Sequence, residues 1–135
     1  MRTRHQVRDL DPFHTAEPAP AGGDDSAPSP MEYVVAALAG CLAVVVETVA
    51  AEQQLHVTAL DIGIEATMDT RGFHGTADVS PHFRDLVVRA RFGLDDPDAL
   101  PGLQDEVERR CPAFNLVKDA GVPITQDWSV VEDAR

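Results

Sequence analysis

The stretch PMEYVVAALAGC, from Pro30 to Cys41, contains a helix start and then, from its fourth residue on, no charged side chain. Ser29 can cap a helix at this point, Pro30 suits the first helical position, and Glu32 stands where a capping box places its carboxylate. Apolar residues then cover every face, which is typical of a buried helix. The many valines leave a strand possible locally, but the capping box and the length of the run favour a helix as far as about Glu52.

The composition is that of one globular domain: 135 residues, 25% charged and 44% hydrophobic. The net charge of −12 argues against binding to nucleic acid or to a membrane surface, because both are anionic. The N-terminus, MRTRHQVRDL, lacks the apolar segment of a secretory signal. The uncharged run from Tyr33 to Val46 is shorter than the roughly 20 residues that cross a bilayer. We therefore expect a cytoplasmic protein.

Residues 1–135 are expected to form a single domain, in which residues 1–29 are a short extended N-terminal segment. Five of the ten prolines lie in the first thirty residues, so this segment can hold at most one short hairpin. Its strands are predicted at Arg2–Arg8 and Phe13–Glu17, on either side of a turn at Asp11-Pro12.

Further along the chain, alternating side chains predict a sheet. From Ile62 the hydrophobic period changes to two, turns at Asp69–Gly72 and resumes through Phe73–Val79, which predicts a hairpin. A third strand follows, with Leu86, Val88, Ala90 and Phe92 on one face and Arg89 and Arg91 on the other. Three consecutive strands with short links indicate an antiparallel meander.

Two more helices and a last strand complete the pattern. A helix is predicted from about Asp98 to Arg110, and Cys111-Pro112 ends it and opens another over Pro112–Ala120. Gly121 is placed to end that helix, and Val122–Val131 is a strand. The predicted fold class is α+β, an antiparallel sheet packed on a long buried central helix. One small sheet covers only one side of such a helix, so the sequence also indicates a second subunit.

The chain has two cysteines, Cys41 and Cys111, and in a cytoplasmic protein a disulfide between them would be transient. Cys41 can be a core residue beside Gly40, where another element comes close, and nothing near it in sequence lowers its pKa. Cys111 follows two arginines and is expected at a helix N-cap, which favours a thiolate. Cys111 also extends an apolar helix stripe into the core, so for each cysteine a structural and a chemical role stay open.

The remaining residues predict neither a metal nor an organic cofactor. The five histidines have no paired spacing on one helix face, and the chain has no Cys-x-x-Cys motif. It also lacks a phosphate-binding glycine loop and a Gly-x-Ser-x-Gly elbow.

Two motifs resemble the OsmC/Ohr family. The first is GGDDSAPSPMEYVVAALAGC, and the second, CPAFNLVKDAGVPI, begins seventy residues after the cysteine that ends the first. The resemblance covers about Gly22 to Trp128, and the predicted order of helix, strands, helix, Cys-Pro and strand matches that fold. It implies an intertwined homodimer with two sites at the interface. It also implies an organic hydroperoxide substrate, an external dithiol reductant, a peroxidatic Cys41 and a resolving Cys111.

The chain departs from the family pattern at two points. The best-known peroxidases carry a glutamate directly after the helix-opening proline, where this chain has Met31. Glu32 comes nine residues before Cys41, which at about 100° per residue places it on the opposite side of the helix, so a capping role is expected. The N-terminal segment is also shorter than the family's usual leading strands. In the family that region supplies an arginine that stabilises the thiolate, and Arg4 or Arg8 is the candidate for it here.

Two hypotheses follow for the function. The first is a thiol-dependent peroxidase that acts in oxidative stress defence through a Cys41 sulfenic acid and a Cys41–Cys111 disulfide. The second is a non-catalytic binder or sensor of an apolar small molecule at the dimer interface, because a buried thiol without an activating group is a poor nucleophile.

Overall fold

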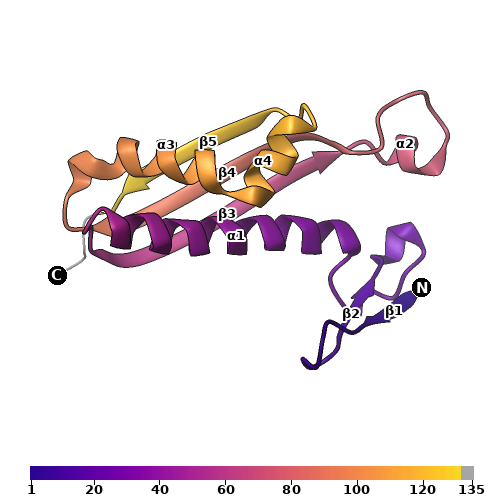
Figure 1. Ribbon diagram of the computed structural model, residues 1–135. Coiled ribbons are helices and arrows are strands. Elements are labelled where there is room, and N and C mark those ends of the chain that lie inside the picture. Colours follow the sequence, from indigo (N-terminus) through magenta and orange to yellow (C-terminus); the bar gives the residue numbers. More distant parts are fainter. Residues whose placement is uncertain (132–135) are drawn as a thin grey trace. The chain divides into compact units, whose positions relative to one another are not determined.

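The computed structural model describes residues 1–131. The chain divides into two compact units, Met1–Ala36 and a second unit that begins at Ala37. The long helix α1, Pro30–Glu52, begins in the first unit and continues into the second. Figure 1 shows the helices and strands of both units.

The first unit contains the predicted hairpin. Strands β1 (Arg2–His5) and β2 (Phe13–Ala16) pair antiparallel, and a single 3-10 turn, η1 (Ala19–Ala21), follows. The His5 ring stacks on Phe13 with centroids 5.1 Å apart, and its Nε2 lies 2.8 Å from the Thr15 hydroxyl. The predicted hairpin is therefore confirmed. Its first strand ends at His5 and not at Arg8, and its turn lies at Val7–Leu10, where the Leu10 N–H donates to the Val7 carbonyl at 3.2 Å, and not at Asp11-Pro12.

Helix α1 begins with the predicted capping box. The Glu32 carboxylate accepts a hydrogen bond from the Ser29 backbone N–H at 2.6 Å, and the Ser29 hydroxyl accepts one from the Glu32 N–H at 3.3 Å. The bond from the Ser29 N–H lowers the pKa of Glu32. Both predicted ends of the helix are confirmed, since it spans Pro30–Glu52.

The second unit holds a three-stranded sheet in the order β3-β4-β5, built from Val57–Met68, Phe83–Leu94 and Ile124–Val130. Strands β3 and β4 are antiparallel neighbours, whereas the predicted meander placed another strand between them. Strands β4 and β5 are parallel, so the prediction of an antiparallel sheet was wrong for this pair. Between β4 and β5 the chain crosses the sheet through η2 (Pro97–Ala99), α3 (Leu100–Arg110) and α4 (Pro112–Asp119). Such a crossover is what parallel neighbouring strands require.

The predicted strand Phe73–Val79 was also wrong. Asp69 instead caps a short helix, α2 (Thr70–His74), by accepting a hydrogen bond from the Arg71 N–H at 3.1 Å. Gly75 ends this helix with a φ of 67°, which other residues rarely adopt. The first residue after α2 that pairs with β3 is Phe83, which lies opposite Met68. A local cap and a glycine turn therefore overrode the alternating pattern.

Helices α1, α3 and α4 lie over one face of this sheet (Figure 1). The β4 side chains predicted for the inner face, Leu86, Val88, Ala90 and Phe92, are all buried, which confirms that strand. On the outer face Arg89 lies 2.9 Å from Glu65 and Arg91 lies 2.6 Å from Asp127. One apolar and one ionic face are expected of a sheet that helices cover on one side only.

Helix α1 is buried on one side only. Within the second unit its buried side chains are those that face the sheet and the other helices: Leu38, Leu42, Val46, Val49 and Ala50. On the other side Val44 is 63% exposed and Ala37, Gly40 and Thr48 are exposed. The expectation of a helix buried on every face therefore does not hold within a single chain.

By length and composition alone, α1 is the one helix of the described residues that could cross a membrane. The sequence-based argument that the uncharged run is too short was wrong for the whole helix, because the apolar pattern extends past Val46 to Glu52. One such helix is weak evidence for a membrane span, since a helix that packs in a protein core passes the same test. Five of its side chains pack in this way.

Candidate functional site

Cys41 lies on α1 at the boundary between the buried and the exposed side of the helix. Its thiol is free and the residue is partly exposed, between the exposed Gly40 and the fully buried Leu42. A Cβ added at Gly40 would meet no atom within 4 Å. The expectation that another element comes close to Gly40 is therefore wrong within the chain. The surface at Gly40, next to Cys41, is therefore open within the chain.

Cys111 lies between α3 and α4 and is the N-cap of α4, as predicted. Its Sγ accepts a hydrogen bond from the Phe114 N–H at 3.4 Å. The side chain is fully buried at 0% exposure, and it continues the buried stripe of Leu103 and Val107 on α3. Both interpretations of its position, the N-cap and the core stripe, are confirmed.

Burial raises the pKa of the Cys111 thiol to about 11. The Phe114 N–H opposes this shift, and the neighbouring Cys41 adds to it. At neutral pH Cys111 is therefore a protonated thiol, and the predicted activation of Cys111 is wrong.

The two arginines before Cys111 are paired with carboxylates instead. Arg109 Nε donates to Glu106 at 3.0 Å, and Arg110 Nη2 donates to Glu52 Oε1 at 3.0 Å with a second, parallel bond between the same groups. The Arg110 pair joins the ends of α3 and α1. Of the two charges next to Cys111 in sequence, Arg110 therefore pairs between two helices and Arg109 pairs within α3.

The fold brings the two cysteines together. Cys41 comes from the middle of α1 and Cys111 from the α3–α4 junction, seventy residues later in the chain. Cys41 is near enough to Cys111 to add to the rise in its pKa. Both thiols are free. A disulfide between them requires that their Cα atoms lie within about 7 Å of each other.

The sequence analysis missed Asn115, which holds the junction that carries Cys111. Its side-chain amide donates to the backbone carbonyls of Glu108 and Cys111, each at 2.8 Å. A signal was present, because an asparagine four residues after a Cys-Pro break can reach back to the carbonyls of the preceding helix end. Only the three-dimensional structure shows that it does so.

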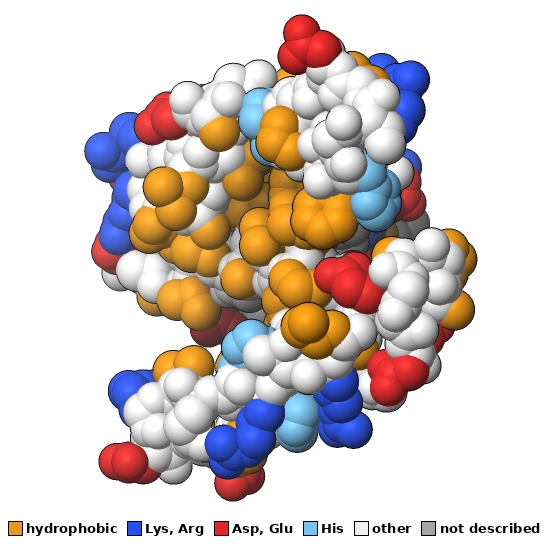
Figure 2. Space-filling model, turned by 90° about the vertical axis from the view of Figure 1, so that its right-hand side faces the viewer, with side chains coloured by type: hydrophobic (Ala, Val, Ile, Leu, Met, Phe, Trp, Pro, Cys, Tyr) orange, Lys and Arg blue, Asp and Glu red, His pale blue; other side chains and the backbone are white. Residues whose placement is uncertain are grey.

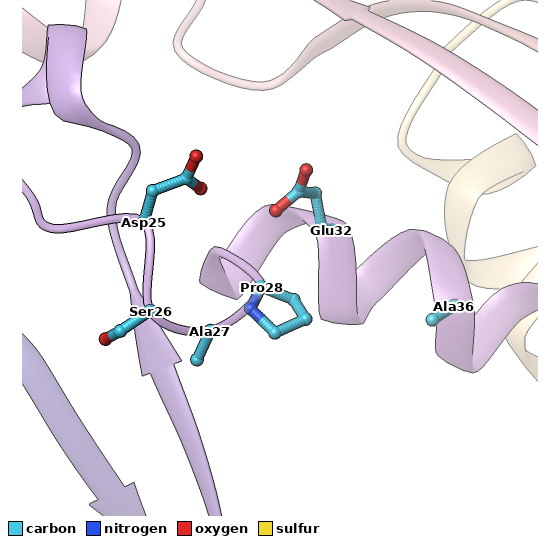
Figure 3. A pocket seen from close by; sticks show the side chains of 6 residues that line it. All are labelled: Asp25, Ser26, Ala27, Pro28, Glu32 and Ala36. Carbon is cyan, nitrogen blue, oxygen red and sulfur yellow. The ribbon is translucent and has the colours of Figure 1, made fainter.

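The first unit has a separate pocket of about 570 Å³ (Figure 3). Its lining includes the carboxylates of Asp25 and Glu32, which flank the opening, and Ala36 further along α1. Since Glu32 is bonded to Ser29, its expected capping role is confirmed. The pocket lining contains no thiol.

Metal-ligating side chains and the N-terminal arginines Arg4 and Arg8 are the other candidate site residues. Among residues 1–131, no three His, Cys, Asp or Glu side chains are grouped so that they could hold a metal ion. Arg4 donates to the side chain of Gln6 at 3.2 Å within the first unit. That Arg4 or Arg8 stabilises a Cys41 thiolate stays a prediction.

Residues 23–127 match the family described as OsmC-like protein. The chain belongs to this family. The α+β fold with its long helix is accordingly that of an OsmC-like protein. No protein with a curated description matches the sequence.

Three solved structures illustrate the likeness of this OsmC-like protein to its relatives. An OsmC-like protein from Mycoplasma pneumoniae has a TM-score of 0.79 and 16% identity, over 93% of this chain and 86% of that one. An organic hydroperoxide resistance protein OsmC from Legionella pneumophila has a TM-score of 0.72 and 19% identity, over 96% of each chain. One from Elizabethkingia anophelis, with thiocyanate bound, has a TM-score of 0.73 and 13% identity, over 96% and 94%. At these identities the likeness establishes the fold.

Proposed function

We propose that this OsmC-like protein is a thiol-dependent peroxidase that reduces organic hydroperoxides in oxidative stress defence. The observation that carries the proposal is the pairing of its only two cysteines, one partly exposed and one buried, from distant parts of the chain. Two similar structures are described as organic hydroperoxide resistance proteins, which supports the same class of substrate.

In the first step the Cys41 thiolate attacks the terminal oxygen of the hydroperoxide. The O–O bond breaks, the alkoxide leaves and takes up a proton to become an alcohol, and Cys41 becomes a sulfenic acid. Cys41 takes this role because it is the thiol that a substrate can reach, whereas Cys111 has no exposed surface.

In the second step the Cys111 sulfur attacks the sulfenic sulfur of Cys41. An S–S bond forms, the S–O bond breaks, and the hydroxyl leaves as water with the proton that Cys111 gives up. Burial is the main cause that raises the pKa of Cys111, so this thiol must give up its proton during the attack.

The surroundings of Cys41 favour an organic substrate over hydrogen peroxide. Leu42, Val44 and Val45 follow it on α1, and the last two leave apolar surface in contact with water. An alkyl or aryl group gains from covering such surface, at roughly 25 cal/mol per Å² of apolar area buried, and hydrogen peroxide has no such group.

The proposal includes two partners. An external dithiol returns the Cys41–Cys111 disulfide to two thiols by exchange, and is itself oxidised to a disulfide. A second copy of the chain covers the exposed apolar side of α1, which makes the active form a homodimer. The proposal also includes a cytoplasmic location, where thiols are kept reduced, as both cysteines are in this structure.

Steady-state turnover of cumene hydroperoxide with a dithiol reductant tests the proposal. We expect turnover in the wild type, none in Cys41→Ser, and in Cys111→Ser a single oxidation that stops at the sulfenic acid. Mass spectrometry of the oxidised wild type should show one intramolecular disulfide. Unchanged reactivity in Cys41→Ser would overturn the assigned order of attack.

A non-catalytic binder is the second candidate, and two observations favour it. Burial raises the pKa of Cys111 to about 11, and both arginines beside it are paired with carboxylates. Met31 also stands where the best-known peroxidases of the family have a glutamate. For such a binder, turnover stays at the background rate in the wild type, while an apolar ligand raises the unfolding midpoint. Rapid turnover that Cys41→Ser abolishes excludes it.

A further inference from the structure

We propose that Asn115 is a positioning residue that holds the Cys111 sulfur in place for attack on oxidised Cys41. The proposal rests on the peroxidase function above and concerns its second step. Asn115 does not take part in the chemistry, and its side chain acts through the backbone on which Cys111 is carried.

The α3–α4 junction closely determines the backbone position of Cys111. Helix α3 ends at Arg110 and α4 begins at Pro112, so Cys111 alone separates them. Its extended backbone, with φ −72° and ψ 114°, turns the chain from one helix into the next. Because Pro112 has no N–H, one donor that could satisfy a carbonyl at this helix end is missing.

The side-chain amide of Asn115 supplies hydrogen-bond donors at this helix end. Its amide nitrogen donates to the Glu108 and Cys111 carbonyls at 2.8 Å each and lies 3.4 Å from the Arg109 carbonyl. Its backbone N–H also donates to the Cys111 carbonyl, at 3.1 Å. One residue therefore ties the end of α3 and the backbone of Cys111 to the first turn of α4.

The consequence is a fixed direction for the Cys111 side chain. Backbone position and the hydrogen bond from the Phe114 N–H together aim the sulfur into the core beside Cys41. Without the Asn115 amide, the Glu108 carbonyl loses this donor and the Cys111 carbonyl keeps only the Asn115 backbone N–H, so the junction can relax toward water. The buried sulfur then spends less time in the geometry that a disulfide requires. Oxidation of Cys41 itself, on α1, does not depend on this junction.

The experiment measures the oxidation of Cys41 and the formation of the disulfide separately in two variants, Asn115→Ala and Asn115→Asp. The aspartate lacks the N–H donors of Asn115 but has nearly the same size. The matched control is Gln104→Ala, since Gln104 bonds to the Glu108 side chain at 2.7 Å and not to the junction carbonyls. One equivalent of cumene hydroperoxide is mixed rapidly with reduced protein. The loss of the first thiol, dimedone-trapped sulfenic acid at Cys41 and the intramolecular disulfide are followed in time.

In both Asn115 variants we expect the first oxidation to stay within about twofold of the wild type, while disulfide formation slows by about tenfold or more. The dimedone adduct at Cys41 should accumulate in these variants and not in Gln104→Ala. Disulfide formation at the wild-type rate in both variants would overturn the proposal. So would an equal slowing of both steps, because that is the result of a general loss of structure.

Failure of the peroxidase function has a different signature. If cumene hydroperoxide produces no disulfide in the wild type, diamide replaces it and oxidises the two thiols directly, being itself reduced to the hydrazine. The positioning role then still requires that diamide form the disulfide about tenfold more slowly in Asn115→Asp than in the wild type and Gln104→Ala. Equal rates of disulfide formation in these three proteins would overturn the positioning role.

Discussion

The two sides of helix α1 are alike in composition and differ in exposure. Leu38, Leu42 and Val46 on one side are at most 1% exposed, whereas Val44 on the other side is 63% exposed. Other large hydrophobic side chains of the second unit are also exposed, among them Phe73 and Leu116, and hydrophobic side chains gather on the face seen in Figure 2. An apolar sequence predicts which side chains leave water, but it does not say what covers them.

Cys41 lies where these two sides meet, and this position explains both of its properties. It is near enough to the buried side to be a neighbour of Cys111, and near enough to the exposed side to be reached from outside. The comparison of the two sides can therefore be tested by substitution on each side and by the reactivity of the two thiols.

The largest effect is expected for Leu42→Asp on the buried side. Leu42 is 0% exposed, and burying an unpaired carboxylate costs more than the whole stability of a small domain can offset. We expect this variant to be unfolded at every protein concentration rather than to give a stable monomer. Circular dichroism checks this, with Leu42→Met as the control that keeps the volume. A folded monomeric Leu42→Asp protein would contradict the assignment of this side to the core.

Much of this buried side could be predicted from the sequence. The capping box at Ser29 and Glu32 fixed the start of α1, and the alternation from Leu86 to Phe92 gave the inner face of β4 correctly. These signals are local, since a cap lies within four residues and a strand face repeats every second residue. The position of Cys111 at a helix N-cap was local in the same sense.

The features that were missed depend on distant parts of the chain. No local pattern gives the direction of β5 relative to β4, which follows from how α3 and α4 cross the sheet. Arg110 looked like an activating charge for Cys111 because the two are adjacent, but its partner is Glu52, 58 residues away. The low thiolate content of Cys111 likewise comes from the packing around it and not from its neighbours in sequence.

The two thiols should differ in reactivity and in its dependence on pH. Only a thiolate is alkylated, and with a pKa of about 11 roughly one Cys111 in ten thousand is ionised at pH 7. Cys41→Ser removes the contribution of Cys41 but leaves the burial of Cys111, so we expect the rate of iodoacetamide reaction to rise from pH 7 to pH 9 by up to about tenfold per pH unit. The sign follows from the raised pKa, because deprotonation lies above this whole range.

The control is Cys111→Ser, in which Cys41 alone reacts. Its rate at pH 7 should exceed that of Cys111, since Cys41 is partly exposed and Cys111 is not. Equal rates for the two thiols at pH 7, with both variants folded, would show that Cys111 is not buried and that its pKa is not raised.

The smallest effect is expected on the exposed side, for Val44→Ala. If water covered Val44 in the active protein, losing two methyl groups there would change stability by less than about 0.5 kcal/mol. If a second copy of the chain covers it, as proposed, the loss is about 1–2 kcal/mol, because the removed methyl groups were buried. We expect the second result, together with an unfolding midpoint that rises with protein concentration in the wild type. Chemical denaturation at several concentrations and sedimentation at micromolar concentration measure both. A well-folded monomer whose stability Val44→Ala leaves unchanged would mean that the exposed side of α1 faces solvent, and that the apolar surface beside Cys41 is open without a partner.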